Sequence, residues 1–239
     1  MASKRFKIVL AIRTLSNFVV IVALVSLAFE FGPVILAEAT FRKDQILGIS
    51  RTVDLDTSID QPATSSTGSV VLPQSSPQAK FGSFLNLAPQ TITPVSADYG
   101  IVIEKINANA KVVPNVNPSD EKSYTSALAQ GVAAVAGSTV PGEPGNLYIF
   151  SHSTDAPWNI IRFNAIFYLL RELELGDRVV MFYKGRRFDY IVYDKQIASP
   201  SDLDFLRNRY DQPVLTLQTC DPPGTLLNRL IVRAKLEGF

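Results

Sequence analysis

The hydrophobic and polar positions divide the chain into three parts. Residues 14–37 form a nearly continuous apolar run, interrupted in its later half by Ser26 and Glu30. The stretch that follows is rich in Ser, Thr, Pro and Gln, and its core cannot bury enough apolar surface to fold. Beyond it, short apolar runs alternate with turns rich in Gly and Pro. Because a bilayer is crossed by about 20 apolar residues in a helix, we predict a transmembrane helix at 14–37, a flexible linker at 38–97 and a folded domain at 98–239.

Basic side chains are concentrated before the apolar run: Lys4, Arg5, Lys7 and Arg13 precede it, and Arg42 and Lys43 follow it. The positive-inside rule then predicts a single-pass protein of the cell membrane, with residues 1–13 in the cytoplasm and the folded domain outside. A cleavable signal peptide is the alternative, because 36–39 (LAEA) resembles a cleavage site, although the apolar run is longer than usual for one. Both interpretations export the folded domain.

The folded domain has a strand-rich pattern. Two runs of aromatic and β-branched residues surround Lys184-Gly185 in 178–198, which is typical of a hairpin. This density of strands with few helices predicts a mainly β fold, a barrel or a sandwich of about 140 residues. The further strands are expected at 99–106, 110–116, 147–151, 214–219 and 230–236, and the helices at 123–136, 160–173 and 199–206.

Composition and charge exclude several classes of function. With 46% hydrophobic and 19% charged residues and a net charge of +1, the chain has no basic excess that would favour nucleic acid. One cysteine excludes an internal disulfide, and one cysteine with one histidine argues against structural zinc. Glu104, Asp120 and Glu121 lack the spacing of a calcium loop, so a solvated surface is the better interpretation. We predict no cofactor and no metal.

The lone cysteine and the lone histidine each end a strand. Cys220 follows VLTLQT, His152 follows LYIFS, and Arg229 begins the strand after the cysteine. A thiolate nucleophile needs a proton-transfer partner, most often histidine, and acyl transfer needs positive charge or donors near the developing oxyanion. Each residue also has a structural interpretation: a buried thiol, a hydrogen-bonded imidazole, and an arginine paired with Asp221. An exported protein normally avoids an unpaired thiol, which favours chemistry.

These residues resemble a known family. LTLQTC followed by Arg229 is similar to the TLxTC…R signature of sortases, the membrane-anchored cysteine transpeptidases of bacterial cell surfaces. The stretch 124–152 resembles the part of the family that ends in the catalytic histidine, and the likeness extends over 98–239. Many sortases have Gly where this chain has Ser151. The resemblance implies an eight-stranded β-barrel with short helices and no redox cofactor, and only some members bind calcium. It is nearer to housekeeping, general-anchoring or class D/E-like types than to pilus types.

The resemblance also implies roles and partners. Cys220 would attack the Thr–Gly carbonyl of an LPxTG-like sorting signal, and His152 would protonate the leaving amine and later deprotonate the incoming one. Arg229 would hydrogen-bond the substrate backbone or the oxyanion. The acceptor would be an amine such as a cell-wall peptide or a pilin lysine, for protein anchoring or pilus attachment.

Two further residues are candidates for substrate binding. Thr219 precedes the nucleophile and would offer its backbone N–H or its hydroxyl, with a structural role in the strand as the alternative. Trp158 would line the substrate groove or pack in the core. Two other functions stay open: an exported cysteine hydrolase in which water resolves the thioester, and a non-catalytic membrane-tethered surface domain in which Cys220 is merely buried.

Overall fold

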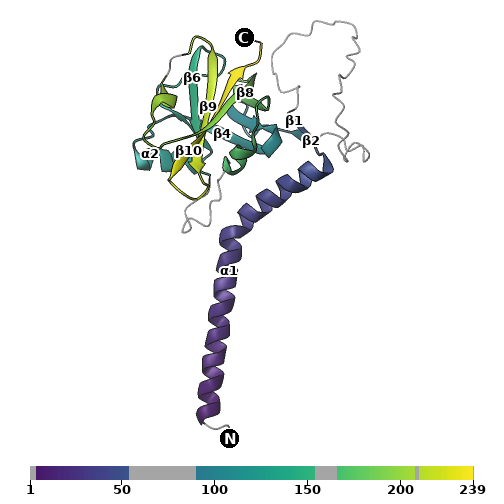
Figure 1. The fold of residues 1–239 in the computed structure, drawn as a ribbon, viewed down its shortest axis with the longest axis vertical. Helices are drawn as coiled ribbons and strands as arrows, with labels where there is room; N and C mark the ends of the chain where they lie inside the picture. The colour runs from purple at the N-terminus through teal and green to yellow at the C-terminus, as the bar shows by residue number, and fades with distance from the viewer. Residues whose placement is uncertain (1–3, 54–89, 154–165, 208–209, 239) are drawn as a thin grey trace.

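The computed structural model describes residues 4–53, 90–153, 166–207 and 210–238 (Figure 1). Trp158 and the central part of the expected linker, 54–89, lie outside these residues. The helices are α1 (Lys4–Leu47) and α2 (Glu121–Leu128), with the 3-10 helices η3 (Glu104–Ile106), η4 (Tyr168–Glu172) and η5 (Asp204–Leu206). The strands are β1 (Arg51–Val53), β2 (Gln90–Ile92), β3 (Tyr99–Ile103), β4 (Ala108–Val116), β5 (Val132–Val135), β6 (Gly145–Phe150), β7 (Arg178–Tyr183), β8 (Arg186–Ala198), β9 (Pro213–Asp221) and β10 (Asn228–Leu236).

Eight of the strands close into a barrel in the order β10-β8-β7-β3-β4-β5-β6-β9, which confirms the predicted fold. Strand pairs β4–β5 and β6–β9 are parallel, and the other pairs around the barrel are antiparallel. Alternate side chains of each strand fill the interior, because successive residues of a strand point to opposite faces. The core contains Leu147 and Ile149 of β6, Leu215 and Leu217 of β9, and Val232 of β10.

Two helical expectations differ from the structure. The range 123–136 divides into the end of α2 and the strand β5. Of the range 160–173, residues 160–165 lie outside the described residues, and 166–173 contain the short helix η4. Gly131 separates α2 from β5, and a Cβ at this position would overlap the carbonyl oxygen of Lys111 in β4. The close approach of the β4 backbone therefore ends the helix and starts a strand, against the helical spacing of Ala and Leu.

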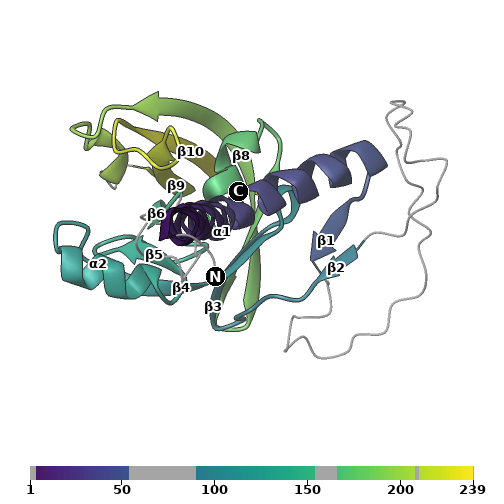
Figure 2. The same ribbon diagram turned by 90° about the horizontal axis from the view of Figure 1, so that it is seen from below.

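Helix α1 reaches farther along the chain than the apolar run. Its segment Lys4–Ala28 is long and apolar enough to cross a membrane, and the helix then continues to Leu47. Residues 38–47, expected in the linker, therefore lie in a helix that runs against the barrel (Figures 1 and 2). The side chain of Phe41 is only 5% exposed and joins the barrel core, which explains why this part of the chain is ordered.

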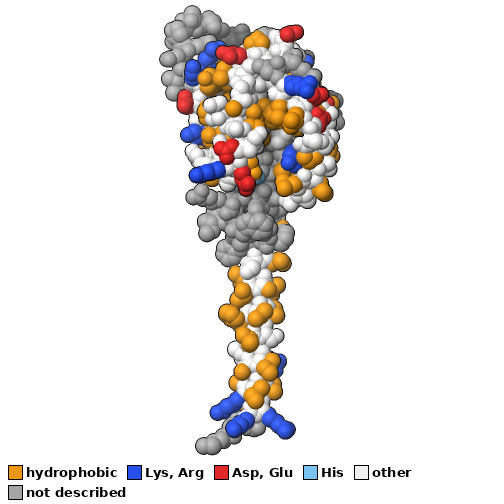
Figure 3. Space-filling view, turned by 90° about the vertical axis from the view of Figure 1, so that its left-hand side faces the viewer, with side chains coloured by type: hydrophobic (Ala, Val, Ile, Leu, Met, Phe, Trp, Pro, Cys, Tyr) orange, Lys and Arg blue, Asp and Glu red, His pale blue; other side chains and the backbone are white. Residues whose placement is uncertain are grey.

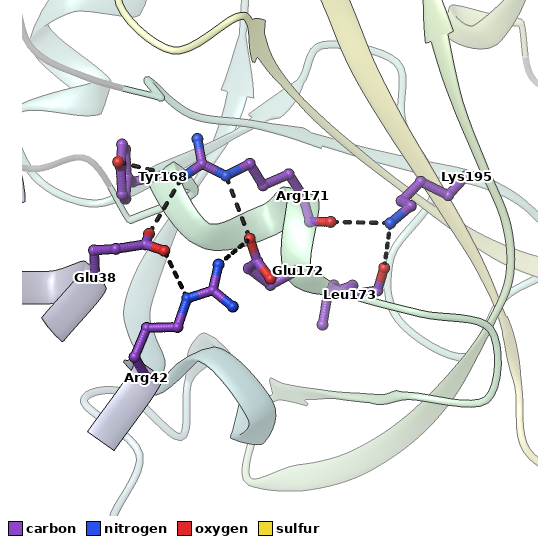
Figure 4. Close-up of polar contacts among 7 residues, drawn as sticks. All are labelled: Glu38, Arg42, Tyr168, Arg171, Glu172, Leu173 and Lys195. Carbon is purple, nitrogen blue, oxygen red and sulfur yellow. Dashed lines mark hydrogen bonds and ion pairs between the residues drawn. The ribbon is translucent and has the colours of Figure 1, made fainter. Parts of the chain in front are cut away.

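The contact between α1 and η4, which we call the seam, is also polar (Figure 4). The carboxylate of Glu38 accepts hydrogen bonds from Arg171 at 3.2 Å and from Arg42 at 3.0 Å. Lys195 of β8 donates to the carbonyl oxygens of Arg171 and Leu173, at 2.9 and 2.7 Å, and so holds η4 on the barrel. Apolar burial and an ion-pair network together attach α1 to the folded domain.

The two short strands outside the barrel lie at the end of α1 (Figure 2). β1 and β2 pair in parallel, with Arg51 opposite Gln90. The backbone N–H of Val53 donates to the Glu104 carboxylate at 2.8 Å, and Arg187 donates to the carbonyl oxygen of Val53 at 3.2 Å. The first and last parts of the expected linker are therefore paired with each other and bonded to the barrel.

Candidate active site

Strand pairing places Arg229 directly opposite Cys220. The two residues are register partners in the antiparallel ladder between β9 and β10. Directly opposed residues project their side chains from the same face of a sheet. Leu215 and Leu217 of β9 fill the interior, so alternation puts Cys220 and Arg229 on the outer face. Both residues are half-buried, which leaves the thiol accessible.

His152 approaches the same place from β6. β6 runs parallel to β9, and Phe150 pairs with Gln218. The backbone N–H of Ser151 donates to the carbonyl oxygen of Gln218 at 3.1 Å, which continues the ladder past the end of the strand. Extending this register by two residues sets His152 beside Cys220. We call the barrel edge where β6 and β9 end and β10 begins the site edge; it is the lower edge of the barrel in Figure 1.

A buried hydrogen bond links the residues that precede the histidine and the cysteine. The hydroxyl of Thr219 donates to the carbonyl oxygen of Ser151 at 3.0 Å, and both residues are buried. Strand alternation directs the Thr219 side chain to the interior, away from the face of Cys220. The hydroxyl considered for substrate binding is thus engaged within the protein, where it fixes β6 against β9 just before the reactive residues.

The side-chain hydroxyl of Ser151 takes no part in this bonding. Its oxygen is buried and has no hydrogen-bond partner among the residues that the structure describes. The contribution of Ser151 to the site therefore comes from its backbone, which bonds to both Gln218 and Thr219.

Burial and charge oppose each other at the thiol. Burial raises the pKa of Cys220, and the nearby Arg229 guanidinium lowers it by a smaller amount. The net pKa lies above the ordinary value of a cysteine, so the thiol is mostly protonated at neutral pH. Arg229 itself donates to the carbonyl oxygens of Asn228 at 3.0 Å and Leu226 at 3.4 Å. These bonds attach the guanidinium to the loop between β9 and β10.

Two polar residues of the site were not found from the sequence. The hydroxyl of Tyr148 in β6 donates to the side-chain oxygen of Gln218 in β9 at 2.5 Å. Burial raises the pKa of Tyr148, with Arg229 lowering it and Asp202 raising it, so the phenol stays a neutral donor. Gln218 lies two positions before Cys220, and this spacing on a strand was the available signal that it shares the face of the thiol.

No metal centre emerges within the described parts of the chain, where no group of three His, Cys, Asp or Glu side chains could hold an ion. Two of the acids weighed for calcium have structural contacts instead. Glu104 accepts from the backbone of Val53, and Asp120 caps α2 by accepting from the N–H of Lys122 at 3.2 Å.

Several solved structures are similar to this chain. A sortase D5 transpeptidase from Clostridium perfringens is 26% identical, with a TM-score of 0.48, and the match covers 59% of this chain and 79% of that one. A lid mutant of sortase A from Corynebacterium diphtheriae is 24% identical, with a TM-score of 0.49 and coverage of 60% and 72%. Sortase C1 from Streptococcus suis is 21% identical, with a TM-score of 0.50 and coverage of 60% and 75%. These structures span three sortase classes and single out none.

No curated protein matches the chain in sequence. The family model of the sortase domain matches residues 101–237, which is more than half of the chain and includes every barrel strand except the first two residues of β3. The chain therefore belongs to the sortase family and is a cysteine transpeptidase of the sortase type.

Proposed function

We propose that the protein cleaves an LPxTG-like sorting signal between Thr and Gly and transfers the acyl group to an amine at the cell surface. The observation that carries this proposal is the pairing of Cys220 with Arg229 across β9 and β10, with His152 two residues beyond the end of β6, which pairs with β9. Nucleophile, proton carrier and cation thus lie at the ends of three adjacent strands. The likeness to the sortase family supports sorting signals as the substrate class.

The reaction follows from these positions. The Cys220 thiolate attacks the carbonyl carbon, the C–N bond breaks, and the His152 imidazolium gives its proton to the leaving amine. The acceptor amine then attacks the thioester and loses a proton to His152, and the thiolate is released as the new amide forms. The guanidinium of Arg229 stabilises the oxyanion that develops in each step. A donor of this kind is worth about 100- to 1,000-fold in rate.

The raised pKa of Cys220 has a kinetic consequence. When the pKa of a thiol lies above that of the neighbouring imidazole, the neutral pair predominates and only a fraction of molecules carries the thiolate–imidazolium pair. Burial favours the neutral thiol, and Arg229 favours the thiolate. The active fraction is therefore set by a residue that also acts on the oxyanion.

We propose further that α1 is an uncleaved anchor, with residues 1–13 in the cytoplasm and the barrel outside the cell. Hydrophobic side chains surround the stem of α1, and Lys and Arg side chains gather at its foot (Figure 3). This distribution fits the positive-inside rule. The packing of Phe41 of α1 into the barrel core also supports retention, because cleavage at the 36–39 sequence would remove the helix turns that precede Phe41.

Mass spectrometry of the full chain in detergent micelles tests the proposal. The protein would be incubated with an LPxTG peptide library and a small amine. We expect a thioacyl adduct on Cys220 and an amine-capped peptide, both absent in Cys220→Ala. Cleaved peptide without the amine would establish a hydrolase, and a thiol that reacts with no peptide and no small alkylating reagent would establish a non-catalytic domain. Trp158→Ala in the same assay tests the proposed contribution of Trp158 to substrate binding through KM.

A further inference from the structure

The loop between β9 and β10, residues 222–227, exposes two adjacent leucines beside the active site. The side chains of Leu226 and Leu227 are 75% and 67% exposed. Scattered exposed leucines are ordinary on protein surfaces, and they gain meaning only from what lies near them. The backbone of this loop also touches the catalytic machinery, because the carbonyl oxygen of Leu226 accepts a hydrogen bond from Arg229.

The position of this loop relative to α1 suggests what covers the leucines. β10 begins at the site edge and ends at the opposite edge, where the C-terminus lies (Figure 1). The site edge, with the 222–227 loop, is turned toward the apolar half of α1, and the opposite edge is turned away (Figure 1). If α1 crosses a membrane, the site edge is the edge of the barrel that faces the bilayer.

The distance between the barrel and the bilayer is short. The apolar part of α1 reaches at least Ala28, and the seam begins at Glu38, ten residues farther along the same helix. At a rise of 1.5 Å per residue, at most about 15 Å of helix separates the hydrocarbon core from the seam. Headgroup layers add about 5 to 8 Å on each side of the hydrocarbon core. The seam and the buried Phe41 hold the barrel on α1, so the site edge is kept next to the headgroups.

We propose that Leu226 and Leu227 insert into the headgroup region of the membrane that α1 crosses. The protein then has two lipid contacts, the helix and this loop, and the active site opens along the membrane surface. The inference rests on the proposed anchor and not on the transpeptidation reaction. Because Arg229 is bonded to the carbonyl oxygen of Leu226, seating of the loop in lipid also fixes the guanidinium beside Cys220.

Depth-dependent fluorescence quenching tests the lipid contact. The full chain with Cys220→Ala and Leu226→Cys would be labelled with an environment-sensitive fluorophore and reconstituted in vesicles of phosphatidylcholine and phosphatidylglycerol that contain a shallow spin-labelled lipid. The matched control carries the label at Glu237→Cys, an exposed residue just after β10 at the opposite edge. We expect at least threefold more quenching at position 226 than at position 237.

A second variant excludes insertion driven by the fluorophore alone. Adding Leu227→Gln to the chain labelled at 226 should reduce lipid quenching at least twofold, because the neighbouring leucine supplies half of the proposed apolar contact. Equal quenching at 226 and 237, or no quenching at 226, would overturn the proposal. So would a label at 226 that is shielded from aqueous iodide and unaffected by the lipid quencher, since a protein surface would then cover the loop.

The test is separate from the proposed function. The labelled chains lack the nucleophile, so their quenching does not depend on any reaction. Resistance of the unlabelled chain to extraction from membranes by alkaline carbonate tests the anchor. A chain that resists extraction and shows no quenching at 226 would leave the anchor and the transpeptidase in place and remove only the loop contact.

Discussion

The site edge and the seam attach distant parts of the chain by different means. At the site edge, backbone ladders place Cys220 opposite Arg229 and bring residues 151 and 152 alongside β9. At the seam, side chains make the attachment: Phe41 packs in the barrel core, and the Glu38 carboxylate accepts a hydrogen bond from Arg171. Backbone ladders fix positions whatever the side chains are, so the site edge is free to carry reactive groups. The seam depends on each of its residues.

The largest expected effect tests whether Arg229 takes part in the reaction or only stabilises the fold. Arg229→Ala should reduce transpeptidation about 100- to 1,000-fold, because the oxyanion loses its cation. Arg233→Ala is the matched control, since Arg233 lies on the same face of β10 and bonds to Asp194 at 2.9 Å and to Tyr210 at 3.1 Å. Product formation per folded molecule should fall only in Arg229→Ala. Equal losses in the two variants would assign Arg229 to the strand and not to the reaction.

The next prediction concerns the stability that Phe41 gives to the attachment of α1. Phe41→Ala should lower the free energy of unfolding by about 3 to 5 kcal/mol, because a large buried side chain is lost from the core. Ile46→Ala lies on the same helix at a side chain that is 70% exposed, and it should change stability by less than about 0.5 kcal/mol. Chemical unfolding of the full chain in detergent measures both. If Phe41→Ala matched Ile46→Ala, α1 would not be docked on the barrel.

A smaller effect examines the bond that links the two reactive strands. Thr219→Val removes the hydroxyl that donates to Ser151, leaves a buried carbonyl unpaired and should cost about 1 to 3 kcal/mol. Because His152 follows Ser151, kcat should fall about tenfold. Thr216→Val is the control, since it removes the bond from Thr216 to Asn146 at 2.7 Å in the same pair of strands. A similar stability loss without a change of kcat is expected there; equal kcat values in the two variants would contradict a positioning role for Thr219.

The smallest effect concerns the protonation of the thiol. Burial raises the pKa of Cys220 and Arg229 lowers it, so Arg229→Ala should raise the pKa further. The pH profile of alkylation by iodoacetamide should shift to higher pH, and the rate near neutral pH should fall. Arg233→Ala should leave the profile unchanged. A shift to lower pH in Arg229→Ala would mean that the guanidinium does not act on the thiol.

The sequence predicted what depends on local periodicity and on chain order. Short apolar runs predicted the barrel strands other than β5, and the start of a strand at Arg229 soon after Cys220 made this arginine a candidate partner of the thiol. The contacts that span long stretches of sequence were not predictable, because no spacing rule connects their partners. Glu38 and Arg171 are 133 residues apart, and Thr219 and Ser151 are 68 apart. Phe41 is a lone aromatic residue in a polar stretch, so no hydrophobic periodicity predicts that its side chain is buried in the barrel.

The continuity of α1 between its apolar segment and the barrel would determine how a membrane-anchored enzyme meets its substrates. A flexible linker of about 60 residues would have a root-mean-square end-to-end distance of about 40 Å, so a tethered domain would sample a wide range of heights. If α1 is the proposed anchor, a continuous helix that packs Phe41 into the barrel core instead holds the active site in one thin layer above the lipid. Encounters then become a search in two dimensions, by lateral diffusion, and a substrate or acceptor is reached only at the height that the helix sets.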